Sequence, residues 1–217
     1  MKNVAVLLAG CGVFDGSEIH EAVLTLLGLS RAGASYQCFA PDIDQLHVVN
    51  HLTGEVAQTE KRNVLVEAAR IARGNIKPTT ALKIADFDAL IIPGGFGAAK
   101  NLCNFALVGA DCEVSAEVRD FISEFALAKK PVGFICIAPV MIPKLYGKGA
   151  IGTIGTDKGT GEAFCAMGGE HKDAQVDEII VDEANKVVST PAYMLAGSIA
   201  EAHSGIEKLV NKVLALA

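Results

Sequence analysis

Short apolar runs rich in β-branched residues, each bounded by Gly or Pro, alternate along this chain with longer segments of helical period. The runs occupy residues 4–9 (VAVLLA), 35–40 (SYQCFA), 87–93 (FDALIIP) and 132–136 (VGFIC). Strands that are apolar throughout are typical of a parallel sheet buried on both faces, and the helices between them supply the crossovers. The pattern therefore predicts an α/β protein with a mostly parallel central sheet. At roughly 150 residues per domain, the 217 residues predict a single domain, 1–217.

The Gly-rich segment GCGVFDGS, which follows the first run, leads into a predicted helix. This helix starts near Ser17 or Glu18, where the side chain of Asp15 or Ser17 can cap the free backbone N–H groups. Arg-Ala-Gly at 31–33 marks its end.

Further helices are predicted at about 62–73, 113–129 and 194–214. The last of them carries a buried stripe formed by Leu195, Ile199, Ala202, Ile206, Leu209 and Val213. Residues 177–191 (DEIIVDEANKVVSTP) predict two strands joined by a turn at 183–185. The polar stretch 42–80 predicts an insertion, which either covers a site or forms a subunit contact.

Charge and hydropathy exclude two classes of partner. The chain has 19 Lys and Arg against 25 Asp and Glu, a net charge of −6, and no basic cluster suited to a phosphate backbone or an anionic membrane. The longest uncharged apolar stretch, 131–143, is too short to span a bilayer. We therefore expect neither nucleic acid nor a membrane as a partner.

The cysteine content argues against metal sites and disulfide staples. The six cysteines are Cys11, Cys38, Cys103, Cys112, Cys136 and Cys165. None of their spacings matches a zinc or haem motif, and no cofactor is expected. The segment VAVLLAG is too short for a signal peptide and lacks a cleavage site. These features predict a reducing, cytoplasmic location.

Cys136 is the sharpest candidate for chemistry. It follows a buried strand without a spacer, so the chain must turn sharply there into a helix, and a helix N-terminus stabilises a thiolate. Cysteine is also one of the residues most often simply buried, and five others occur here. PGGFG at 93–97 ends a neighbouring strand and can add backbone amides for an oxyanion hole.

Two carboxylates follow the first strand and can serve as a proton partner. Glu18 and Glu21 lie three residues apart, on one face of the predicted helix. Alternatively each is a solvated acid in a first helical turn. His20 is expected at the surface. His171, in the sequence HKD, is either the base of a Cys-His-acid triad or a solvated residue of a polar loop.

GCGVFDG only loosely matches a dinucleotide fingerprint, so a nicotinamide cofactor is not favoured.

Four sequence blocks together resemble one family. LAGCGVFDGSEIHEAVLTLL, IIPGGFGAAKNL, GFICIAP and VSTPAYMLA resemble the ThiJ/PfpI branch of the class I glutamine amidotransferase-like superfamily, in its enhancing lycopene biosynthesis (ElbB) subgroup. The resemblance implies a flavodoxin-like three-layer sandwich, a homodimer, and a nucleophile-elbow cysteine beside a glutamate. Cys136 matches the elbow cysteine. Counting back from Gly33 to the family's acid gives Glu21, with Glu18 as second choice.

Some positions depart from the family pattern. No His follows Cys136, and Thr156 stands where some relatives have one; Phe134 and Ala138 flank the elbow where relatives have smaller residues. Protease and amidotransferase chemistry need a base to activate the nucleophile or an acid to protonate the leaving amine, so these gaps argue against both.

The resemblance also implies cofactor-free glyoxalase chemistry on a small dicarbonyl substrate. The Cys136 thiolate adds to glyoxal, or to methylglyoxal, and amides of Gly94, Gly95 and Ile137 hold the oxyanion. Glu21, its pKa raised by burial and like charge, first acts as an acid and then shuttles protons, so that water finally releases glycolate. A non-catalytic binding or regulatory protein of isoprenoid biosynthesis and a Cys136 redox sensor are the alternatives.

Overall fold

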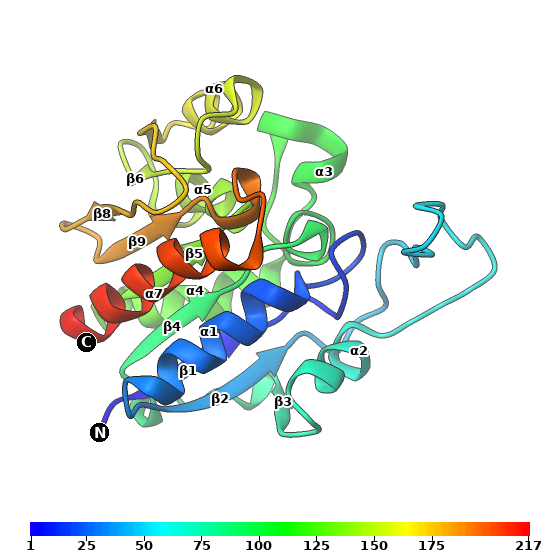
Figure 1. The fold of residues 1–217 in the computed structure, drawn as a ribbon, viewed down its shortest axis with the longest axis horizontal. Coiled ribbons are helices and arrows are strands. Elements are labelled where there is room, and N and C mark those ends of the chain that lie inside the picture. The colour runs from blue at the N-terminus through cyan, green and yellow to red at the C-terminus, as the bar shows by residue number, and fades with distance from the viewer.

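The computed structural model describes residues 1–217 and contains a seven-stranded sheet between two layers of helices (Figure 1). The strand order is β3-β2-β1-β4-β5-β9-β8, and every neighbouring pair is parallel except β8 and β9. The strands are β1 (Asn3–Leu7), β2 (Ser35–Ala40), β3 (Ile76–Pro78), β4 (Ala89–Ile92), β5 (Val132–Ile135), β8 (Ile180–Asp182) and β9 (Val187–Thr190). A separate pair joins β6 (Ile151–Gly152) to β7 (Glu170–His171). The predicted flavodoxin-like fold with a mostly parallel sheet is confirmed.

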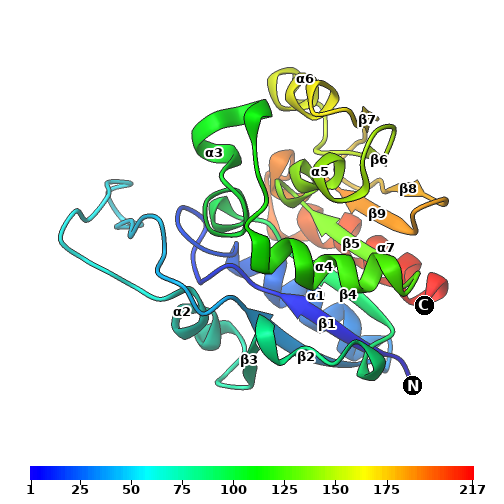
Figure 2. The same cartoon turned by 180° about the vertical axis from the view of Figure 1, so that it is seen from behind.

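The helices divide between the two faces of the sheet, as Figures 1 and 2 show from opposite sides. Their bounds are α1 (Ile19–Arg31), α2 (Val64–Ile71), α3 (Phe105–Val108), α4 (Ala116–Leu127), α5 (Ile142–Tyr146), α6 (Lys158–Ala166) and α7 (Ile199–Leu216). Side chains of α1, α2 and α7 share one buried cluster, and those of α4, α5 and α6 share the other. No helix combines the length and apolar character needed to cross a bilayer.

The central strands are apolar throughout because both of their faces are covered. In β1, Val4 and Val6 join one buried cluster, and Ala5 and Leu7 join the other. All residues of β4 and β5 are buried as well. Each fully buried aliphatic side chain contributes about 1.5–3 kcal/mol of transfer free energy, so these strands anchor the loops at their carboxyl ends.

The first helix begins and ends close to its predicted bounds, but its cap differs. The N-cap is Glu18, whose carboxylate accepts from the N–H of Glu21 at 2.7 Å. Neither predicted cap has this role, because the Ser17 hydroxyl accepts from the N–H of Ala9 and the Asp15 carboxylate accepts from a neighbouring loop. The predicted end at 31–33 is confirmed.

The last helix starts five residues later than predicted. Ser198 is its N-cap and accepts a hydrogen bond from the N–H of Glu201, so the helix begins at Ile199. Leu195 lies before it, at the end of a 3₁₀ turn, and does not belong to the helical stripe. Ile199, at the first position of α7, is 50% exposed, so its predicted place in the buried stripe is also wrong, whereas the predicted positions from Ala202 to Val213 are buried. The predicted strand pair is confirmed as β8 and β9.

The segment 42–80 contains two different kinds of structure. At its end, α2 and β3 extend the parallel sheet beyond β2. Residues 41–63 form an excursion that projects from one side of the body in Figure 1. Three hydrogen bonds join it to the loop after β1 and to Asn101: the N–H of Val49 donates to Asp15 at 2.7 Å, the N–H of Leu46 donates to Asn101 at 3.0 Å, and the N–H of Phe14 donates to Nε2 of His51 at 3.1 Å.

Candidate active site

The loops that follow β1, β4, β5 and β9 meet at the carboxyl edge of the sheet. The chain leaves β1 toward β2 on one side and later returns to place β4 on the other, which makes this edge a topological switch point. The loop after β4 packs closely on the loop after β1: Phe96 N–H donates to the Val13 carbonyl, and Glu18 N–H donates to the Gly94 carbonyl. The two Gly-rich loops therefore meet at this edge of the sheet.

Cys136 occupies the sharp turn that the sequence predicted. Its φ of 62° lies in the left-handed region, which non-glycine residues seldom adopt, and it separates β5 from a 3₁₀ turn at Ala138–Met141. Its N–H donates to the Thr190 carbonyl of β9 at 2.9 Å, so the sheet ladder holds the strained residue in place. The thiol is directed to the cavity at this edge, and the residue is 7% exposed.

Glu21 lies in the first turn of α1 and is completely buried. One carboxylate oxygen accepts from Gly94 N–H at 2.9 Å and the other from Tyr193 N–H at 3.2 Å. Its carboxyl lies next to the Cys136 side chain, with Gly94 packed against both. Of the two candidate acids, Glu21 is thus the one beside the thiol, whereas Glu18 caps the helix and lines the cavity wall.

Gly94 fits between the thiol and the carboxylate only because it lacks a side chain. A Cβ atom there would lie 2.5 Å from Cβ of Cys136 and 2.8 Å from Oε2 of Glu21. Its N–H is already given to Glu21, so the prediction that Gly94 helps to bind an oxyanion is wrong. The amides of Gly95 and Ile137 instead point to the sulfur of Cys136.

Burial is the main cause of the shifted pKa of both titratable groups. Burial, and then the charge of Glu18, raise the pKa of Glu21 to about 7, against the hydrogen bonds it accepts. Burial, followed by the charge of Glu21, raises the pKa of the Cys136 thiol well above its ordinary value, although the Gly95 and Ile137 amides lower it in part. The raised pKa of Glu21 agrees with the prediction. The resting Cys136 thiolate expected from the sequence does not agree with the structure. The element after Cys136 is a short 3₁₀ turn, and the charged group nearest to the sulfur, the Glu21 carboxylate, is negative.

The thiol opens into a cavity of about 440 Å³. Its lining is formed by Val13, Glu18, Gly95, Phe96, Ala99, Phe105, Ala106, Cys136, Ile137, Thr160, Tyr193 and Met194. Most of this lining is apolar, and none of it is cationic. No cluster of three or more His, Cys, Asp or Glu side chains is arranged to hold a metal ion.

The structure separates the two histidines that the sequence singled out. His171 lies outside the cavity; its side chain is 8% exposed, and its Nε2 accepts from Ile154 N–H at 3.2 Å. It is therefore neither beside Cys136 nor solvated. Burial lowers its pKa, opposed by Asp173. His20 is half exposed as predicted, but its Nδ1 lies 2.9 Å from the hydroxyl of Tyr193.

Tyr193 is the residue that the sequence reasoning missed. It follows β9, lines the cavity and gives its N–H to Glu21. Its signal was present in the block VSTPAYMLA, at the end of a strand, where parallel sheets place their sites. Thr156, where some relatives have a His, is exposed and does not line the cavity.

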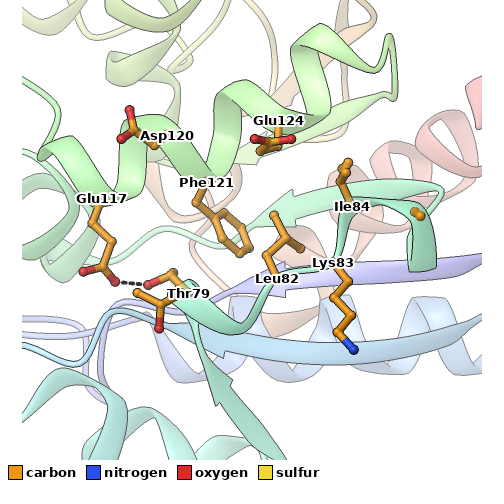
Figure 3. Close-up of a pocket in the computed structure, with 10 residues that line it drawn as sticks. Thr79, Leu82, Lys83, Ile84, Glu117, Asp120, Phe121 and Glu124 are labelled. Carbon is orange, nitrogen blue, oxygen red and sulfur yellow. Dashed lines mark hydrogen bonds between the residues drawn. The ribbon is translucent and has the colours of Figure 1, made fainter.

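A larger hollow, of about 600 Å³, lies between α4 and residues 79–85 (Figure 3). Glu117, Asp120 and Glu124 lie along its helical side, and Thr79 bonds to Glu117. The hollow shares no residue with the Cys136 cavity and has no cysteine or histidine. Its chemistry therefore offers no nucleophile-and-acid pair comparable with Cys136 and Glu21.

Comparison with known proteins finds relatives over nearly the whole chain. The chain is 50% identical over 223 residues to the mitochondrial ES1 protein homolog of Rattus norvegicus, covering 99% of this chain and 84% of the relative. It is 49% identical over 223 residues to the mitochondrial glutamine amidotransferase-like class 1 domain-containing protein 3 of Homo sapiens, covering 99% and 83%. No protein-family model matches the chain.

Among solved structures, the chain is similar to an isoprenoid biosynthesis protein with an amidotransferase-like domain from Ehrlichia chaffeensis, with 38% identity, a TM-score of 0.92 and coverage of 100% and 99% of the two chains. Glyoxalase III from Candida albicans shares the fold, with a TM-score of 0.64, 14% identity and coverage of 99% and 97%.

The names of the relatives correct one prediction. The rat, human and zebrafish (Danio rerio) proteins are all named as mitochondrial, which contradicts the cytoplasmic location expected from the sequence. That expectation rested on free cysteines, and all six are free in the structure. Free thiols indicate a reducing environment but do not distinguish one reducing compartment from another.

Proposed function

This chain belongs to the ES1 family of glutamine amidotransferase-like class 1 proteins, and from that premise we propose that it is a cofactor-free glyoxalase. The substrate is glyoxal or methylglyoxal, and the product from glyoxal is glycolate. The observation that carries the proposal is the position of the Cys136 thiol next to a buried carboxyl, Glu21, whose pKa is about 7. A group with that pKa gives and takes protons equally well at neutral pH.

In the first step the sulfur of Cys136 adds to one aldehyde carbon. Glu21 acts first as a base here, rather than first as an acid as expected from the sequence, because the neutral thiol gives its proton to Glu21 as the C–S bond forms. The aldehyde oxygen becomes an oxyanion. The N–H groups of Gly95 and Ile137, which point to the sulfur, are available to that oxygen. Glu21 then protonates the oxygen, and the product is a hemithioacetal on Cys136.

In the second step a proton moves between the two carbons of the substrate. Glu21, ionised again, removes the hydrogen of the carbon bound to sulfur, and an enediol forms. Glu21 then delivers the proton to the neighbouring carbon, leaving a thioester and a new hydroxyl group. Water hydrolyses the thioester, which releases glycolate and restores the Cys136 thiol. No external oxidant or cofactor is consumed.

The assay is glycolate formation from glyoxal by the purified, metal-free protein. We expect wild type and the control Cys165→Ser, which changes an exposed cysteine outside the cavity, to produce glycolate. Cys136→Ser and Glu21→Gln should lose at least about 10²-fold in kcat, because each removes a reacting group. Full activity in Cys136→Ser would sink the proposal.

A non-catalytic role in isoprenoid biosynthesis is the second candidate. It is favoured by the name of the Ehrlichia chaffeensis protein and by the mostly apolar cavity, which suits a hydrophobic ligand. The same assay discriminates the two candidates, since a wild type that makes no glycolate above the variants' background supports the binding role. A redox sensor is disfavoured, because peroxide reacts with thiolates and the pKa of Cys136 is raised.

A further inference from the structure

The segment after β9 is held in a strained conformation that directs Tyr193 at the site. Ala192 has a φ of 43°, in the left-handed region that residues with a side chain seldom adopt. Such strain persists only where neighbouring contacts fix it, and it concentrates at functional sites. Here the contact is the N–H of Tyr193, which donates to Oε1 of Glu21 at 3.2 Å. The backbone of Tyr193 is thereby tied to the proposed proton shuttle.

The hydroxyl of Tyr193 is held as well. It lies 2.9 Å from Nδ1 of His20, and the two rings are tilted with their centres 5.8 Å apart. Nδ1 of His20 in turn lies 3.9 Å from Oε1 of Glu18. Tyr193 and Glu18 both line the cavity that holds the Cys136 thiol, so the tyrosine, histidine and glutamate form a polar group on an otherwise apolar wall.

The proposed reaction needs a hydrogen-bond donor that the residues discussed so far do not supply. When Glu21 removes the carbon-bound proton, negative charge develops on the oxygen of the second carbonyl. The Gly95 and Ile137 amides serve the first oxygen. Thr160 also lines the cavity, but its hydroxyl donates to Asp157 at 2.7 Å. The Tyr193 hydroxyl remains. With the proton of His20 on Nδ1, the atom 3.9 Å from the Glu18 carboxylate, the histidine donates to the Tyr193 oxygen and the Tyr193 O–H stays free to donate into the cavity.

We infer that Tyr193 is a catalytic residue that protonates the second carbonyl oxygen of the substrate, and that His20 is a positioning residue that holds the Tyr193 hydroxyl. The inference rests on the proposed glyoxalase function. As Glu21 takes the proton from carbon, the electron pair of that C–H bond forms the carbon–carbon double bond, and the carbonyl π electrons take the Tyr193 proton. When the thioester forms, the hydroxyl proton on the sulfur-bearing carbon returns to the tyrosine oxygen. Protons and electrons therefore balance without a further reactant.

The test compares Tyr193→Phe with wild type and with Tyr36→Phe, which removes the hydroxyl of a tyrosine on β2 away from the cavity. Tyr193→Phe should lower kcat for glycolate formation by about 10²-fold or more, with KM changed little, because one proton transfer is lost. It should still form the glyoxal adduct on Cys136, visible by intact-protein mass spectrometry. Tyr36→Phe should behave as wild type.

His20 is tested by a double-mutant cycle. His20→Ala should lower kcat by about tenfold in the wild-type background and have no further effect in Tyr193→Phe, since its role acts through the hydroxyl. His20→Asn, whose side chain can reach the Nδ1 position, should recover part of the loss. His20 is half exposed, so these variants should fold.

The outcomes separate the two proposals. If wild type forms glycolate and Tyr193→Phe retains its kcat, the role of Tyr193 is overturned while the glyoxalase function stands. If wild type forms no glycolate, the glyoxalase function fails and takes this inference with it. An effect of His20→Ala that is equally large in both backgrounds would overturn the positioning role of His20.

Discussion

Gly94→Ala is the substitution that tests most directly how closely the thiol and the carboxyl are packed. Gly94 has a backbone conformation open to any residue, so only contacts oppose the change. The added methyl group would lie 2.5 Å from Cβ of Cys136, 2.8 Å from Oε2 of Glu21 and 2.8 Å from the Ile135 carbonyl. None of these atoms ends a flexible, exposed side chain, so the backbone or the reacting groups must shift.

The magnitude follows from overpacking in a rigid site. Inserting a methyl group into a well-packed region costs about 1–3 kcal/mol. For a chain of this size, roughly 3 °C of Tm per kcal/mol gives a loss of about 3–9 °C. The activity should fall further, since a displacement of about 1 Å between reacting groups can cost on the order of 10²-fold in rate.

The measurement is a thermal melt together with glycolate formation from glyoxal. Gly159→Ala is the matched control: Gly159 lies in α6, and its nearest neighbour to an added Cβ is Oδ1 of Asp157 at 3.8 Å. It should raise the free energy of unfolding by up to about 1 kcal/mol through helix propensity and leave the rate unchanged. A Gly94→Ala protein with wild-type Tm and wild-type kcat would refute the close packing of Cys136 against Glu21.

Three further predictions follow from individual contacts. Burial raises the pKa of Glu21 from 4.5 to about 7, so its contribution to the free energy of unfolding is fully present below pH 4.5 and is lost as the pH rises through 7. Urea titrations of wild type should show a loss of about 3 kcal/mol across this range, and Glu21→Gln should not show it. Parallel pH profiles of the two proteins would contradict the shifted pKa. Asn101→Leu removes the hydrogen bonds of Asn101 to the carbonyls of Ala9 and Asp15, both at 2.9 Å, and to the excursion 41–63. It should lower the free energy of unfolding in urea by about 2–4 kcal/mol and speed proteolysis within 41–63. Uniform or unchanged cleavage would show that Asn101 does not hold the excursion in place. Gly205→Ala should destabilise α7 by about 1–3 kcal/mol despite better helix propensity, because its Cβ would lie 2.5 Å from the Thr190 hydroxyl; a raised Tm would contradict this.

Local pattern was sufficient to predict the sheet and the elbow. The central strands are apolar on both faces, so their type and direction could be inferred from composition alone. The turn at Cys136 followed from the absence of any spacer between a strand and the next element. The edge strand β3 was missed because its three residues, Ile76–Pro78, are only partly buried and include a proline.

Side-chain partners could not be derived in the same way. Helical spacing places Glu18 and Glu21 on one face but does not say which of them faces the thiol; that depends on the angle at which α1 packs and on the amides of Gly94 and Tyr193. The family count selected Glu21, and the structure places that residue beside Cys136. Tyr193 was missed because its contact to His20 spans 173 residues of sequence.

Charge in the cavity also bears on which chemistry fits it. No cationic side chain lines the cavity, and burial raises the pKa values of both Cys136 and Glu21, so the site disfavours negative charge on either group. Amide hydrolysis needs a group that protonates a leaving amine, which in thiol enzymes is an imidazolium. The proton shift within a dicarbonyl adduct needs no such cation, because protons only pass between the adduct and the acids Glu21 and Tyr193, and the total charge stays the same. The site is therefore better suited to isomerising a bound adduct than to expelling an amine.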